Sequence, residues 1–145
     1  TAGGPTGHGG PWPDGAAAIF PFRRRSAKQV TFISDPPYPQ HPAPDCVAGH
    51  LSDVRSCTRP RSDSTVLPAI KAAELRIAKQ EQVNSIDPVS WFCAPKLCPV
   101  IVGNILVYHD KSHMTLEWSR FIAPVLDNAI LRTIKPPPAR DPSSA

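Results

Sequence analysis

The segment WFCAPKLCPVIVGNILVYHDKSHMT, residues 91–115, holds the clearest fold signal in this sequence. It begins as a tight loop between two cysteines, and two short apolar runs then flank Gly103-Asn104. A two-residue turn with glycine in first place is typical of a type II′ β-hairpin. A polar stretch, residues 109–114, leads from this hairpin into a helix that is predicted to begin at Thr115.

Asp110 and His113 lie three residues apart in that polar stretch. A turn of this length can fold the carboxylate back onto the imidazole and fix its tautomer. The other ring nitrogen is then free to take a proton from a serine hydroxyl. The pair is therefore the candidate catalytic site. The spacing alone is a weak signal, because it also suits a solvated loop with Asp110 near a helix N-terminus.

His109 gives a second interpretation of the same stretch. It lies four residues before His113, so the two imidazoles would share one face of a helix and could bind a metal ion together with Asp110. The Asp–His pair accounts for the stretch without His109. We therefore favour the pair and expect neither a metal nor a cofactor.

The preceding sequence follows a strand–helix–strand pattern. Residues 30–34, VTFIS, are apolar and β-branched and stop at turn residues, as in a buried parallel strand. An apolar stripe predicts a helix over residues 66–82, with Ser64 or Thr65 as its cap. Residues 83–87 supply the second strand. This pattern predicts an α/β fold with a parallel sheet.

Two details of the helices can be tested. Lys71, Glu74, Lys79 and Gln80 fall mostly off the apolar stripe of the first helix. Pro124 falls inside the last helix, whose stripe includes Trp118 and Phe121. A proline at that place is expected to bend the helix, or to break it at a cost of about 3 kcal/mol.

The two ends of the chain are rich in proline and glycine. Residues 1–27 are predicted to be a disordered low-complexity linker, and residues 136–145 a disordered tail. A single domain is left at residues 28–135. Because the chain starts with Thr1, it is expected to be a processed product or a fragment.

Composition narrows the class of protein. The chain has 145 residues and a formal net charge of +4, and its one dense basic run is Arg23-Arg24-Arg25. That run has no interleaved aromatic residues, so a solvated basic segment is favoured over a nucleic-acid site. No apolar run reaches the roughly 18 residues of a membrane span, and no secretory signal is visible.

The four cysteines occur as two near pairs, Cys46 with Cys57 and Cys93 with Cys98. Neither pair has the spacing of a zinc knuckle. Both lie in proline-rich loops, so local pairing as two disulfides is favoured over four buried thiols. Disulfides would place the domain in an oxidising compartment outside the cytoplasm.

In order and spacing, several blocks of the chain resemble one family. They are DPPYPQHPAPDC, the WFC…CP loop, the VIVGN hairpin, the Asp110–His113 motif, and a helix carrying APVL. Together they resemble the SGNH (GDSL-like) hydrolase domain that is fused to membrane acyltransferases of family three in actinobacteria. The resemblance covers the C-terminal half of that domain, from residue 28 to about 132. Met114 stands where leucine is commoner.

The resemblance implies a partial three-layer, flavodoxin-like α/β domain outside the cytoplasm. It would act on acyl esters of cell-envelope carbohydrate by transfer or hydrolysis, with His113 as general base and Asp110 as its orienter. The family's nucleophile lies in a Gly-Asp-Ser block, which is missing here together with the oxyanion-hole blocks. Ser62-Asp63-Ser64 is only superficially similar. The chain is therefore expected to be a truncated or split product that is inactive alone.

Two kinds of partner follow from this resemblance. The catalytic partners would be an acyl-ester or carbohydrate substrate and a membrane acyltransferase domain, with no nucleic acid. The alternative is a non-catalytic accessory or binding fragment, stapled by disulfides, that docks on a protein supplying the missing strands.

Overall fold

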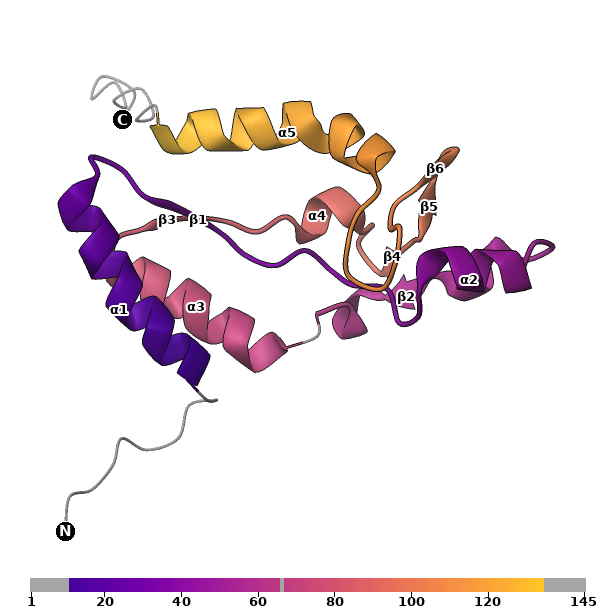
Figure 1. The fold of residues 1–145 in the computed structure, drawn as a ribbon, viewed down its shortest axis with the longest axis horizontal. Coiled ribbons are helices and arrows are strands. Elements are labelled where there is room, and N and C mark those ends of the chain that lie inside the picture. The colour runs from indigo at the N-terminus through magenta and orange to yellow at the C-terminus, as the bar shows by residue number, and fades with distance from the viewer. Residues whose placement is uncertain (1–10, 66, 135–145) are drawn as a thin grey trace, which may run out of the picture.

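Two parallel strands lie at the centre of the fold. The computed structural model describes residues 11–65 and 67–134. In it, β1 (Thr31–Ile33) pairs in parallel with β3 (Asn84–Ile86), and the crossover between them contains α3 (Pro68–Gln80). Figure 1 shows α1 and α3 on one side of this pair and α5 on the other. The predicted strand–helix–strand unit and three-layer arrangement are confirmed, and the sheet has two strands among the described residues.

The other elements are short pieces around this centre, apart from the two long helices at the ends of the described chain. In chain order they are α1 (Pro11–Ser26), α2 (Ala43–Gly49), η1 (Val54–Cys57), β2 (Arg59–Pro60), η2 (Arg61–Asp63), α4 (Val89–Phe92), β4 (Leu97–Cys98), β5 (Ile101–Val102), β6 (Ile105–Leu106) and α5 (Leu116–Ile134).

The prediction of a disordered linker over residues 1–27 is wrong for residues 11–26, which form α1. Ala16 and Phe20, one helical turn apart, are buried in a small cluster against α3, and the Phe20 ring lies 5.4 Å from that of Phe32. The glycines and prolines near the N-terminus made a helix look unfavourable there, so the spacing of this apolar pair was overlooked. Residues 1–10 and the predicted tail, 136–145, lie outside the described residues.

The basic run ends α1. Cations at a helix C-terminus are favourable because the last carbonyls carry partial negative charge. Arg24 is also used for packing, because its Nη1 donates to the Glu81 carbonyl at 2.7 Å, where α3 ends. All three arginines of the run are exposed, and one of them ties α1 to α3.

The start of α3 differs from the prediction in two ways. Leu67 is the N-cap residue and no side chain caps the helix. Ser64 is instead fully buried and donates to the Arg61 carbonyl at 2.8 Å. Lys71 and Glu74, although off the apolar stripe, are buried, and the Lys71 ammonium pairs with Asp87 at 2.8 Å.

A second, larger core lies under the hairpin and the start of α5. The predicted hairpin is confirmed, since β5 and β6 pair antiparallel around Gly103-Asn104 and Gly103 has φ +61°. No positive φ occurs at Asn104, which fits a type II′ turn. The buried members of this core are Ala43, Val89, Phe92, Cys93, Cys98, Val100, Val107, Tyr108, Trp118 and Ile122.

Both predicted disulfides are present beside this core. Cys46 bonds to Cys57 with Cα atoms 5.9 Å apart, and Cys93 bonds to Cys98 with Cα atoms 4.1 Å apart. The first joins α2 to η1, and the second closes the loop between α4 and β4. Both therefore fix segments that have little regular structure of their own.

The last helix runs unbroken through Pro124, so the predicted break does not occur. Pro124 and Arg120, whose carbonyl loses its partner, are exposed, so water can satisfy that carbonyl. Only part of the predicted stripe is covered: Trp118 is buried, whereas Phe121 is 57% exposed. Other large apolar side chains of α5 that are left exposed are Leu116, Val125, Leu131 and Ile134.

Candidate active site

The loop that carries Asp110 and His113 is closed at its base. Tyr108 and Met114 form an isolated antiparallel bridge, and the His109 N–H donates to the His113 carbonyl at 2.9 Å. Tyr108 is buried, and its hydroxyl donates to the Pro37 carbonyl at 2.8 Å, in the segment that follows β1. The loop is therefore anchored both to the hairpin side and to the parallel-sheet side of the molecule.

Asp110 organises the loop through both carboxylate oxygens. Oδ1 accepts the backbone N–H of Ser112 at 2.6 Å and that of His113 at 2.7 Å, while Oδ2 lies 2.7 Å from Nδ1 of His113. These hydrogen bonds, the one from Ser112 first, hold the pKa of Asp110 well below its usual range. The carboxylate is thus ionised at neutral pH and held in one orientation.

His113 is oriented as the sequence predicted. Because the ionised Asp110 accepts at Nδ1, that nitrogen carries a proton, and the neutral ring then has its lone pair on Nε2. The His113 side chain is 75% exposed. No hydrogen-bond partner for Nε2 is found within residues 11–65 and 67–134. The pair can therefore accept a proton from an incoming group at Nε2.

A cavity of about 720 Å³ opens beside the loop. Lys111 and Ser112 form part of its wall, and the rest comes from the segment after β1, from Arg59 and from the start of α3. Asp35 and Pro36 follow the carboxyl end of β1, the position at which open α/β sheets bind ligands.

No serine is placed to be activated by Nε2 in the described part of the chain. Ser112 lies at the other ring nitrogen, with its Oγ 3.3 Å from Nδ1 of His113 and 3.3 Å from Asp110. Ser64 is buried and bonded to backbone. The hydroxyl of Ser62 donates to Asp63. Within the described residues, the pair therefore has a free Nε2 but no serine hydroxyl bonded to it.

His109 is beside the pair rather than part of it. Its Nε2 lies 3.8 Å from Oδ2 of Asp110, and its ring centre lies 6.4 Å from that of His113. The metal site considered from the sequence would need these three side chains to converge. Over residues 11–65 and 67–134, the group of three side chains close enough to share an ion lies elsewhere.

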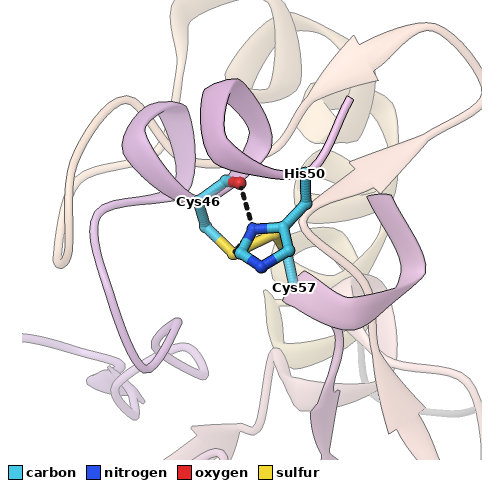
Figure 2. A group of neighbouring side chains, drawn as sticks. All are labelled: Cys46, His50 and Cys57. Carbon is cyan, nitrogen blue, oxygen red and sulfur yellow. Dashed lines mark hydrogen bonds between the residues drawn. A yellow bond between two sulfur atoms is a disulfide. The ribbon is translucent and has the colours of Figure 1, made fainter. Parts of the chain in front are cut away.

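That group is Cys46, His50 and Cys57, shown in Figure 2. The two sulfur atoms are bonded to each other, so neither is a thiolate that could bind a metal. The His50 ring lies against the disulfide, with Nδ1 2.8 Å from the Cys46 carbonyl oxygen. The sequence reasoning missed this group, although the four-residue spacing of Cys46 and His50 on one helix could have indicated it.

The family model described as the SGNH domain fused to AT3 domains matches residues 18–128. The chain belongs to this SGNH family. No curated protein and no solved structure is significantly similar to the chain. The match confirms the resemblance and the partial α/β fold, and it begins ten residues before the predicted start at residue 28, within α1.

Membership makes this a hydrolase- or acyltransferase-like domain in general terms. The matched region contains Asp110 and His113, and the structure brings them into contact. Their catalytic role remains a prediction. No helix of the described residues is long and apolar enough to cross a membrane.

Proposed function

We propose that this SGNH domain supplies the Asp–His half of a serine acyl-transfer site. The reaction is O-acyl transfer or ester hydrolysis on cell-envelope carbohydrate, outside the cytoplasm. The observation that carries the proposal is the 2.7 Å contact between Oδ2 of Asp110 and Nδ1 of His113, whose side chain is 75% exposed. The two disulfides support the location, because they persist in oxidising compartments.

The two residues have distinct roles in this chemistry. Nε2 of His113 removes the proton of a serine hydroxyl as the oxygen attacks the acyl carbon, and returns it to the leaving alcohol. Asp110 stabilises the imidazolium that forms between these steps. In the second half-reaction, His113 activates water or the acceptor hydroxyl in the same way.

The serine has to come from a Gly-Asp-Ser block outside these 145 residues, since none occurs in the sequence. The oxyanion donors have to come with it. We therefore expect the purified chain to hydrolyse a chromogenic acetyl ester no faster than a His113→Ala variant does.

A chimera tests the proposal directly. Fusing the Gly-Asp-Ser and oxyanion blocks of another SGNH domain before residue 11 is expected to produce esterase activity. His113→Ala should abolish that activity and Asp110→Asn should reduce it about 10³–10⁴-fold, whereas His109→Ala should leave it nearly unchanged. A folded chimera whose activity is indifferent to His113 would refute the catalytic role.

A second candidate function is favoured by the uncovered surface. Among the described residues, the parallel sheet consists of β1 and β3 alone. In α5, Phe121 and Ile134 are each more than half exposed. Parallel sheets are normally buried on both faces and wider than this. The chain would then be an accessory fragment that docks on a partner providing further strands. Stable partner binding that survives His113→Ala, together with an inactive chimera, would favour this role.

A further inference from the structure

The cavity beside the Asp–His loop is lined by apolar and by charged side chains. Its apolar lining comes from Pro36 and Tyr38 after β1 and from Leu67 and Ile70 at the start of α3. A pocket with apolar walls and a few polar groups is typical of small-molecule sites. At about 720 Å³ it is far larger than a single acetyl group needs. Its charges therefore indicate which kind of molecule it accepts.

Arg59 is the most informative of these charges. It is half-buried at the cavity wall, and one N–H donates to the Tyr38 carbonyl at 3.2 Å. A guanidinium has five N–H donors, so four remain. Within residues 11–65 and 67–134, no carboxylate oxygen lies within 4.0 Å of it. The cation is thus partly removed from water without a counter-ion, which is how proteins prepare a site for carboxylate or phosphate.

The backbone of Arg59 is held in place. It lies in β2, directly opposite Cys98 of β4, and Cys98 is bonded to Cys93. The guanidinium is therefore presented by a cross-linked element and does not depend on a free loop. A preorganised donor loses less entropy when it binds an anion.

Lys111 adds a second cation on the side of the dyad. It lies between Asp110 and Ser112, is exposed, and has no ion pair in the part of the chain that the structure describes. The third cation of the lining, Lys71, is already paired with Asp87. The lining also contains two carboxylates, Asp35 and the buried Glu74, which lies one turn after Lys71 on α3.

We propose that this cavity binds the anionic group, a carboxylate or a phosphate, of the carbohydrate that the site acylates or deacylates. Arg59 is its main contact and Lys111 its second. That the bound molecule is a substrate rests on the proposed function. Asp35 opposes anion binding and limits the affinity.

The test is a binding titration on the intact, oxidised chain by NMR. Its probes are glucuronate, glucose 6-phosphate and neutral glucose. Glucuronate and glucose 6-phosphate are expected to bind at the cavity, and their binding should weaken as the salt concentration rises. Neutral glucose should bind much less tightly. Comparing the two anions distinguishes a carboxylate site from a phosphate site.

Variants locate the interaction. Arg59→Gln is expected to weaken anion binding by about tenfold or more, as for loss of a charge-assisted hydrogen bond. Lys111→Gln should weaken it a few-fold, and Asp35→Asn should strengthen it. Arg55→Gln, which removes an exposed arginine from η1, is the matched control and should change nothing. Lys111 and Asp35 are exposed, so their variants remain informative if Arg59→Gln fails to fold.

His113→Ala separates this inference from the proposed function. It should leave anion affinity unchanged while abolishing activity of the chimera. Anion binding with an inactive chimera would refute the catalytic role alone. Equal binding of glucose and glucuronate, or affinity indifferent to Lys111→Gln and Asp35→Asn, would overturn the anion site even if the chimera is active.

Discussion

The hairpin region and the parallel-sheet region of this SGNH domain are built in different ways. The hairpin region has a core of ten buried residues, Trp118 among them, and contains both disulfides. The parallel-sheet region has a smaller apolar cluster, with four buried residues, Ala16, Phe20, Ala78 and Val83, and no disulfide. We therefore expect the hairpin region to be the more stable of the two, although its strands are shorter. Core packing and cross-links there replace the hydrogen bonds of a longer strand ladder.

This difference separates the two parts of the proposed site. The Asp110–His113 loop extends from the hairpin region, which has the larger core. The parallel strands, which direct ligands to their carboxyl ends, lie in the region with the smaller core. We infer that the dyad keeps its geometry when the parallel-sheet region opens locally.

Trp118→Ala should destabilise the domain by about 3–5 kcal/mol, because Trp118 fills the centre of the larger core at 2% exposure. Denaturant unfolding measures the effect. Phe121→Ala, in the next turn of α5 and 57% exposed, is the matched control and should cost far less. Equal losses in the two variants would contradict the assignment of the core.

Removing the disulfides should act on the hairpin region alone. In the chain-entropy view, replacing Cys46 and Cys57 by serine costs about 3 kcal/mol, and replacing Cys93 and Cys98 about 2 kcal/mol, because the second loop is shorter. Hydrogen exchange should increase in residues 43–60 or 93–108 respectively. Comparable deprotection of α1 would show that the two regions unfold together.

Gly103→Ala should cost about 1–2 kcal/mol, because an L-residue is strained at φ +61°, although the space around the turn is open. Gly49→Ala is the control: the space is equally open and no positive φ is required, so it should be neutral or slightly stabilising. Thermal unfolding of both variants checks this. A neutral Gly103→Ala would argue against the type II′ turn.

The smallest expected effect is the response of the dyad to acid. The folded-state pKa of Asp110 lies below its ordinary value of about 3.9, so its contribution is fully present above that pH and is lost as pH falls through the folded pKa. The carboxyl ¹³C shift of Asp110 should accordingly stay constant down to pH 4. A titration midpoint near 4 would mean that the hydrogen bonds from Ser112 and His113 do not form.

Local features could be predicted from the sequence. The hairpin at Gly103, the two disulfides and the Asp110–His113 contact each depend on residues within about a dozen positions of each other. Turn chemistry and short spacings decide such features without knowledge of the rest of the fold.

Features that depend on distant segments could not be predicted. Lys71 is buried because Asp87, sixteen residues away, pairs with it. The helix α1 is stabilised by contacts between Phe20 and Phe32 and between Arg24 and Glu81. The cavity wall likewise combines separate segments, so Arg59 has no signal in the sequence beyond its charge.

The C-terminal end of α5 fixes a length in the molecule. Thr133 accepts a hydrogen bond from Gln29 at 3.0 Å through its carbonyl, and its hydroxyl lies 2.9 Å from that of Thr31, where β1 begins. At its other end the same 19-residue helix continues directly from the dyad loop. With a rise of about 1.5 Å per residue, α5 separates these two attachment points by about 28 Å. Inserting one residue into α5 would turn its two ends by about 100° relative to each other, so the contacts of Thr133 and the junction with the dyad loop could not both be kept unchanged.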